Sequence, residues 1–442
     1  MVVWNLPAEF TPWIAALTWP LHGRLAWRLR PVLQGVLFAR GRRTVASWLR
    51  AAGLGADFPA YYYFLAVVGR CTQSIAGSLL RLLLQHVVQG DRLLFALDDT
   101  PTKRYGPKVQ GAGIHHNPTP GPTDQKFLYG HLWVTLAWVV RHPRWGTLGL
   151  PLLAWLYVRA QDVPRLPARA GWAFQTKLEL AARLVAWLVS WGRFLDKTLW
   201  VVVDGGYTKA PFLKPALRAG VVVVGRLRKD AALRDVPPRR RPGQRGRPRI
   251  YGPSAISLAK RAGQKRGWQA IEAVLYGQRV TKTVKTFLAT WRPVGGTARV
   301  LLVREQHTWL AFFCTDPMAS VEEILEAVAD RAAIEQDFHD LKEVEGLGQQ
   351  QVRNVWANLG AFHLNLWAHT FVELWAWDQP KAVLCDRTAS PWDDPERRPS
   401  HADRRKALQR HCIQHEITRE AHRRPLSRKT HRLLQSLLQL FS

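Results

Sequence analysis

The spacing of apolar residues changes from a helical to an extended period near residue 91. From Phe10 to about Gln89, apolar residues recur every three to four positions and predict amphipathic helices. Beyond Asp91, compact runs of branched and aromatic residues predict strands at Leu93–Leu97, Phe127–Val140, Thr147–Val158 (broken by Pro151), Thr198–Val203 and Val221–Val224. Helices are expected between these runs, from Ala173 to about Leu195 and at Lys209–Ala219. Strands that alternate with helices predict an α/β core with a mixed sheet.

A second group of strands interrupts this core after a tract rich in proline, glycine and arginine, Pro237–Pro248, which cannot bury a core of its own. Short strands are expected at Trp268–Tyr276, Val280–Trp291, Ala298–Val303 and Thr308–Phe313. Helices return at Val321 to about Glu345, at Asn354–Trp377 and from about Ala402. The predicted division is therefore a helical domain at 1–90, a core in two parts at 91–225 and 316–380, a basic linker with a β insertion at 226–315, and a basic helical tail at 381–442.

Charge narrows the possible partners of this chain of 442 residues. Its formal net charge is +30, and a field of that size attracts polyanions, above all nucleic acid. A membrane surface is the alternative, but the longest apolar stretches, Phe127–Val140 and Gly146–Val158, are too short to span a bilayer. The four cysteines lack the spacing of a disulfide framework or a zinc site, and the first residues do not resemble a secretory signal. We therefore expect a cytoplasmic, nucleoid-associated protein without membrane association.

Acidic residues stand at three places that the predicted fold could bring together. Asp98 and Asp99 follow the first strand, Asp204 follows a buried strand, and Glu335 lies on a predicted helix. Open α/β sheets build their sites at the carboxyl ends of strands. Carboxylate oxygens suit Mg²⁺ or Mn²⁺, and two such ions can activate a nucleophile and stabilise the leaving oxygen of a phosphodiester. Because side chains alternate along a strand, only one of Asp98 and Asp99 can point into such a site.

Basic residues accompany the first aspartates and Glu335. Arg331, Glu335 and Lys342 fall within about 40° of one another on a helix, so the acid could hold metal while the cations hold a DNA backbone. The alternative is an ordinary surface ion pair. Lys103 and Lys108 follow the first acid in a loop that we expect to line the substrate groove. Arg104 stands in the same loop.

Other motifs allow both a DNA-contacting and a structural interpretation. The segment Gly41–Leu54, with Thr44 as helix cap and Gly53 as helix end, is either half of a helix-turn-helix unit or an ordinary amphipathic helix. Arg245 and Arg247 resemble the centre of a minor-groove hook. Their alternative interpretation, which we favour, is a solvated linker that binds phosphate without sequence preference.

Paired histidines and tryptophans have weaker functional interpretations. His115 and His116 lack a third zinc ligand at useful spacing, so hydrogen bonding to phosphate or to the protein is favoured over metal binding. Trp268 and Trp291 could stack on an unpaired base, but core packing is the default for a tryptophan. Neither pair is therefore assigned a functional role.

Taken together, the motifs resemble the DDE transposases of bacterial insertion sequences, in the group around the insertion sequence numbered four. That group carries an Asp-Thr after the first strand, an Asp-Gly-Tyr/Phe type of strand end, and the pattern Tyr-x2-Arg-x3-Glu-x6-Lys. The matching positions are Asp99-Thr100, Asp204-Gly-Gly-Tyr207, and Arg331, Glu335 and Lys342, with Val328 at the tyrosine position. The resemblance covers about Leu93 to Trp377.

This resemblance implies a ribonuclease H-like core in which Asp99, Asp204 and Glu335 are catalytic and hold two Mg²⁺ or Mn²⁺ ions. Asp98 would then be a neighbour of the metal site or a partner of the helix. The implied function is a DNA transposase that binds the inverted-repeat ends of its element as a homodimer and catalyses strand cleavage and strand transfer, in relatives through a hairpin. The alternatives are a ribonuclease H-like DNA nuclease without transposition and a catalytically dead DNA-binding regulator.

Overall fold

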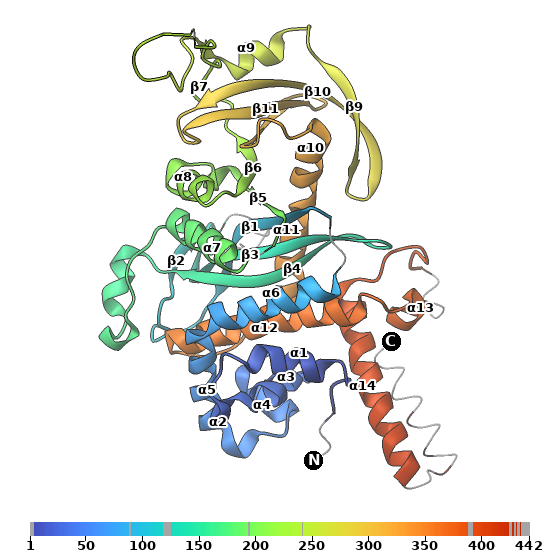
Figure 1. Cartoon of the computed structure of the whole chain (residues 1–442). Helices are drawn as coiled ribbons and strands as arrows, with labels where there is room; N and C mark the ends of the chain where they lie inside the picture. Colours follow the sequence, from blue (N-terminus) through green and yellow to red (C-terminus); the bar gives the residue numbers. More distant parts are fainter. Residues whose placement is uncertain are drawn as a thin grey trace.

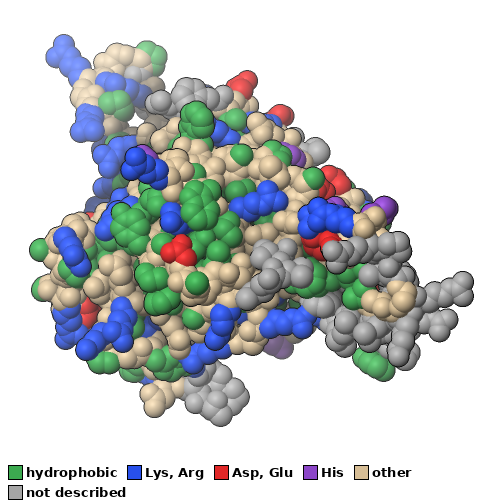
Figure 2. Space-filling view, turned by 90° about the horizontal axis from the view of Figure 1, so that it is seen from below, with side chains coloured by type: hydrophobic (Ala, Val, Ile, Leu, Met, Phe, Trp, Pro, Cys, Tyr) green, Lys and Arg blue, Asp and Glu red, His purple; other side chains and the backbone are tan. Residues whose placement is uncertain are grey.

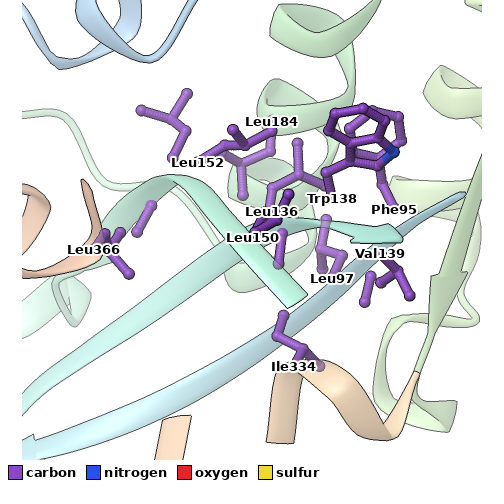
Figure 3. Close-up of a cluster of buried hydrophobic side chains, with 14 of the residues drawn as sticks. Phe95, Leu97, Leu136, Trp138, Val139, Leu150, Leu152, Leu184, Ile334 and Leu366 are labelled. Carbon is purple, nitrogen blue, oxygen red and sulfur yellow. The ribbon is translucent and has the colours of Figure 1, made fainter. Parts of the chain in front are cut away.

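The computed structural model describes residues 4–87, 90–117, 125–192, 195–240, 242–387 and 392–423, with the single positions 427, 430 and 434. The strands of these residues belong to one sheet, and helices cover both of its faces (Figure 1). Leu184 of α7 (Lys177–Gly192) and Ile334 of α11 (Ala332–Glu343) approach the sheet from opposite sides (Figure 3). Both side chains belong to the buried apolar core. The chain is therefore mixed α/β, as the sequence predicted.

Five strands form the part of the sheet that corresponds to the predicted core. Their order is β4 (Gly146–Tyr157), β3 (Phe127–His142), β1 (Arg92–Lys103), β5 (Thr198–Val203) and β6 (Val222–Leu227). β4, β3 and β1 pair antiparallel, whereas β1, β5 and β6 pair parallel. This mixed order is compatible with the predicted ribonuclease H-like fold. A short strand, β2 (Gly113–His116), pairs with the start of β3.

The predicted β insertion continues the same sheet. Beyond β6 follow, in antiparallel order, β12 (Trp309–Cys314), β11 (Gly296–Arg304), β10 (Gln278–Trp291) and β9 (Gln269–Leu275). Two short strands, β7 (Leu233–Arg234) and β8 (Ala255–Ile256), extend from the end of β10. The four strands expected between 268 and 313 are confirmed. The five-part domain division remains a prediction.

Strand β1 is longer than the sequence suggested, and this changes the position of the first acids. Its parallel pairing with β5 ends at Leu97, but its antiparallel pairing with β3 continues to Lys103. The expectation that the strand ends before Asp98 is therefore wrong, because it overlooked the long antiparallel partner. Pro151 likewise does not break β4, because the register against β3 shifts by one residue beside it.

The remaining long elements are helices, and some of them begin where the sequence supplies a cap. Ser320 and Glu323 form a capping box before α10, and the Asn354 side chain accepts the Ala357 N–H before α12. The helices not yet named are α1 (Phe10–Thr18), α2 (Gly23–Ala26), α3 (Leu29–Phe38), α4 (Val45–Ala51), α5 (Phe58–Arg70), α6 (Thr72–His86), α8 (Ala210–Arg218), α9 (Leu258–Gly263), α10 (Val321–Asp330), α12 (Val355–Ala376), α13 (Lys381–Leu384) and α14 (His401–Arg423).

Two of these helices cross at very short distance. A Cβ atom at Gly360 of α12 would collide with the Leu65 carbonyl of α5, and one at Gly69 of α5 would collide with the Trp356 carbonyl. Glycine at both positions therefore allows the N-terminal helices to pack closely on α12. Among the described residues, no helix combines the length and the apolar character that crossing a membrane would require.

Candidate active site

Asp204 stands where β5 leaves the sheet. The apolar run of β5 is buried up to Val203, and the exposed Asp204 then caps a single 3-10 turn, Gly205–Tyr207, by accepting the Gly205 N–H. This turn brings Tyr207 back beneath the strand ends, where its ring is buried. The Tyr207 hydroxyl donates a hydrogen bond of 2.7 Å to Oδ1 of Asp99. The second predicted acid is thus linked to the first through its own turn.

Asp98 and Asp99 point to opposite faces of β1, as alternation along a strand requires. Asp99 lies on the face covered by α7, and the Lys177 ammonium is 3.1 Å from its Oδ2. Asp98 lies on the face covered by α11, and the Arg331 guanidinium is 2.7 Å from its Oδ2. Asp98, unlike Asp99, therefore shares its hydrogen-bonding partner, Arg331, with Glu335.

Glu335 approaches β1 through a break in its helix. The single helix expected from Val321 to about Glu345 is wrong, because a turn at Arg331 divides it into α10 and α11. From this junction one guanidinium nitrogen of Arg331 contacts Asp98, and the other contacts Glu335, which lies in the first turn of α11. The Glu335 side chain remains 56% exposed. Arg331 consequently bridges the strand acid and the helix acid at the surface.

The electrostatics show that these acids lie close together. Burial raises the pKa of Asp98 to about 6, although Arg331 and the Asp99 N–H favour its ionised form, and the charges of Asp99 and Asp204 raise it further. Burial would lower the pKa of Arg331, but Asp98, Glu335 and Asp204 together raise it. Burial, and then Asp99, also raise the pKa of Tyr207, so its hydroxyl keeps its proton. Several acids therefore converge around one arginine.

This cluster suits hard divalent cations. It offers carboxylate oxygens from two strands and a helix. These carboxylates repel one another, so cations bound between them would stabilise the site. Two of the carboxylates, on Asp204 and Glu335, are accessible from solvent. The residues present thus fit the predicted metal chemistry. The choice of Asp99 rather than Asp98 as the ligand remains a prediction, and the contacts of Arg331 favour Asp98.

The predicted DNA-contacting residues are only partly gathered at this site. Arg331 lies within it, and Lys342 is half-buried on α11 with a pKa that burial lowers. Lys103 is exposed at the end of β1, and Lys108 is exposed in the loop that follows. Two further predicted contacts, Arg245 and Arg247, lie elsewhere. They are exposed on the connection between β7 and β8, at the opposite end of the sheet from β4 (Figure 1).

Lys177 is a site residue that sequence reasoning missed. It begins α7 and pairs with Asp99, 78 positions earlier in the chain, so no local motif could reveal the contact. Arg104 also differs from its charged neighbours, because it is buried. Its guanidinium donates to His131 and to the Gly348 carbonyl, so it ties the loop after β1 to the segment between α11 and α12.

The remaining motifs are found in structural surroundings. His115 is buried, and burial lowers its pKa to about 4, while His116 is exposed. Trp291 is buried in the core, whereas Trp268 is half-buried and contacts two cations, Lys285 and Arg304, through its ring. Trp291 therefore packs in the core, as expected by default for a tryptophan.

The predicted start and end of the helix in the segment Gly41–Leu54 are confirmed. The Thr44 side chain accepts the Ser47 N–H before α4, and Gly53 adopts a left-handed backbone after it. Most of α4 is buried, with Ala46 and Arg50 as its exposed positions. A recognition helix would present more of its surface than this. The amphipathic interpretation of the segment therefore fits its burial better.

Comparison with known proteins identifies the family. The family model described as DDE superfamily endonuclease matches residues 21–292, which is more than half of the 442-residue chain. The match includes Asp98, Asp99 and Asp204, and it ends before the helix of Glu335. No curated protein matches the chain. The chain belongs to the DDE superfamily endonucleases.

Proposed function

We propose that this protein is a DNA transposase that cleaves and transfers DNA strands with the help of divalent metal ions. The observation that carries the proposal is the convergence of Asp98, Asp204 and Glu335 around Arg331. Membership of the DDE superfamily endonucleases supports nuclease chemistry, and these enzymes use divalent metals. The formal net charge of +30 supports DNA as the substrate.

The acids would hold two Mg²⁺ or Mn²⁺ ions, which would activate the attacking oxygen and stabilise the leaving oxygen of the phosphodiester. We infer that Asp204 and Glu335 are ligands, together with one aspartate of β1. Asp98 is our preferred third ligand, because it faces α11, and Asp99 is held by Lys177 and Tyr207 on the other face. Asp99, which the family motif favours, is the alternative ligand. The mutants described below distinguish between the two aspartates.

Residues around the acids would position the DNA. Arg331, Lys342, Lys103 and Lys108 lie within ten positions of an acid along the chain, and each can neutralise a phosphate. A second surface lies on the N-terminal helices, where Figure 2 shows Lys and Arg side chains among hydrophobic ones, with few acidic side chains. Exposed aromatic residues on these helices or directly after them are Trp19, Trp27, Phe58 and Tyr63. We infer that this surface helps to bind the inverted-repeat ends, with two copies of the chain on paired ends.

The test is cleavage of DNA that carries the ends of the element by single mutants. Asp204→Asn and Glu335→Gln are expected to abolish cleavage and to leave binding of the ends largely intact. Asp98→Asn is expected to behave in the same way, and Asp99→Asn to retain measurable cleavage. Asp230→Asn is the matched control, because Asp230 is an exposed acid paired with Arg228 on the surface.

Each outcome discriminates between functions. If Asp204→Asn or Glu335→Gln cleaves as well as wild type, the site assignment is wrong. If the wild-type protein cleaves DNA but does not join precut ends to a target, it is a nuclease without transposition. If it binds the ends without metal and never cleaves, it is a DNA-binding regulator.

A further inference from the structure

A second cluster of ionisable residues lies on the other side of α11 from Glu335. It consists of Asp337 on α11, His369 and Glu373 on α12, and His401 at the start of α14. All four side chains are buried, and each residue is at most 3% exposed. They line a cavity of about 730 Å³ between these helices and the turn that joins β3 to β4. The cavity gives a small ligand a route to groups that are otherwise enclosed.

The cluster gathers side chains of the types that ligate metal ions. One ligand atom from each of His369, Glu373 and His401 lies within 4.8 Å of the others. Oδ1 of Asp337 is 4.0 Å from Nε2 of His369. Two imidazoles with one or two carboxylates form a ligand set that zinc prefers and that Mg²⁺ does not. The cluster thus differs in chemistry from the all-oxygen acids at β1 and β5.

Some of these polar atoms lack a partner within the protein. Both ring nitrogens of His369, and Oδ2 of Asp337, are buried without a hydrogen bond to any residue that the structure describes. His363, on the same helix, shows the ordinary arrangement: its Nδ1 is 2.8 Å from the Leu359 carbonyl and its Nε2 accepts the Ala154 N–H. Because buried polar groups are normally paired, His369 has hydrogen-bonding or ligating capacity that the described residues do not use.

The residues behind the cluster are arranged to orient its ligands. Nε2 of His401 is 3.0 Å from Glu345, which leaves Nδ1 facing Oε1 of Glu373 at 2.7 Å. Arg404 binds the other oxygen of Glu373. A carboxylate on the outer nitrogen of a ligating histidine is the usual support in zinc sites. Glu345 and Arg404 therefore fix His401 and Glu373, whose Nδ1 and Oε1 atoms share a hydrogen bond that a bound metal ion would replace.

We propose that His369, Glu373, His401 and Asp337 bind one zinc ion, which fastens α11 to α12 and α14. Zinc would take the place of the proton between Nδ1 of His401 and Oε1 of Glu373 and release it to solvent. The ring of His369 would turn out of its stack on His401 to add a nitrogen, and a carboxylate oxygen of Asp337 would complete four ligands of a closed structural site. This site is separate from the DNA-cleaving acids. Its occupancy does not depend on the proposed function.

The test is metal uptake by the full-length protein after treatment with a chelator. The Glu335→Gln variant is used so that the acids at β1 and β5 are weakened as competitors. Zinc bound per chain is measured by mass spectrometry after removal of free ion, and Co²⁺ is added as a spectroscopic probe. We expect one zinc per chain and the intense visible absorption of tetrahedral Co²⁺ with nitrogen ligands. Bound zinc far below one per chain, or only the weak absorption of octahedral Co²⁺, overturns the proposal.

Variants identify the ligands. His369→Gln is expected to lose the Co²⁺ band, while His363→Gln, a buried histidine of the same helix, keeps it. Glu345→Gln removes the support of His401, together with the buried pairing to Arg405, and is expected to weaken zinc binding by about 10- to 100-fold in protein that circular dichroism shows to be folded. An unchanged band in His369→Gln contradicts the assignment. If that variant does not fold, the uptake by Glu335→Gln and the affinity of Glu345→Gln still decide the outcome.

Discussion

The two sides of α11 carry ionisable clusters of opposite character. On one side Arg331 faces Asp98, Glu335 and Asp204, and burial raises the pKa of Asp98 to about 6. On the other side burial would raise the pKa of Glu345, but Arg405 and His401 hold it at about 2. In this second cluster, Oδ2 of Asp337 and both ring nitrogens of His369 have no hydrogen bond to a described residue.

The cluster around Arg331 has more acidic than basic groups and can bind further cations, whereas the charges of the buried cluster are mostly paired with one another. An excess of partly exposed acids weakens the folded state and is useful where metal ions and a phosphate must be bound. A buried network of matched charges tolerates no loss of a partner. Neutralising a carboxylate should therefore destabilise the protein in the buried network, and stabilise it or leave it nearly unchanged beside Arg331.

The largest effect on stability is expected for Glu373→Gln. This substitution leaves Arg404 and His401 buried without the carboxylate that both contact. Breaking a buried ion pair in this way costs about 3–5 kcal/mol of unfolding free energy. Urea denaturation in the presence of a chelator measures it. A loss below about 1 kcal/mol would show that the buried network contributes no more to the unfolding free energy than a surface ion pair does.

Asp98→Asn is expected to stabilise the protein at high pH. Since the pKa of Asp98 is raised in the folded state from 3.8 to about 6, folding becomes less favourable as the pH rises through this window. At pH 8 the neutral asparagine should therefore increase the unfolding free energy by up to about 3 kcal/mol. Near pH 4 the gain should vanish. Thermal unfolding at both pH values checks this, and an equal gain at both would refute the cause.

A smaller loss is expected for Tyr207→Phe. The substitution removes the hydrogen bond of 2.7 Å to Asp99 and leaves Lys177 as the partner of that carboxylate. A hydrogen bond to a charged group contributes about 1.5 kcal/mol. Chemical denaturation measures the loss. If Asp99 rather than Asp98 holds metal, the variant should also lose affinity for Mn²⁺, which titration calorimetry would detect.

The smallest effect on stability is expected for Glu335→Gln. Its side chain is more than half exposed, and its pairing with Arg331 is an i,i+4 pair at the surface. Such pairs contribute less than about 1 kcal/mol, so the variant should unfold almost like wild type. The same variant should nevertheless fail to cleave DNA. Parallel denaturation and cleavage assays separate the two properties, and a strongly destabilised variant would contradict the comparison.

The sequence predicted the elements of the candidate site better than their contacts. The position of Asp204 follows from an apolar run that ends in Asp-Gly-Gly, and the strands of the β insertion follow from their alternation. The extent of β1 could not be read from its own residues, because its partner β3 decides where pairing ends. The break at Arg331 was missed for a similar reason: the arginine is held by Asp98, 233 positions away.

The buried cluster was also beyond local reasoning. His369 and Glu373 stand four positions apart on α12, a spacing that places both on one face and could have drawn attention. His401 and Asp337 come from other helices, and nothing in their surroundings in the sequence indicates that they meet. Charge composition favoured nucleic acid as a partner but did not indicate the placement of Arg245 and Arg247 away from the acids.

The central claim is that one aspartate of β1 joins Asp204 and Glu335 in a single divalent-metal site. The most direct measurement compares DNA cleavage by Asp204→Cys, Asp98→Cys and Asp99→Cys in Mg²⁺ and in Mn²⁺, because a thiolate binds the softer Mn²⁺ better than Mg²⁺. We predict that Asp204→Cys and Asp98→Cys are inactive with Mg²⁺ and regain cleavage with Mn²⁺, while Asp99→Cys shows no such dependence. Full activity of Asp204→Cys with Mg²⁺, or no recovery of any variant with Mn²⁺, would contradict the claim.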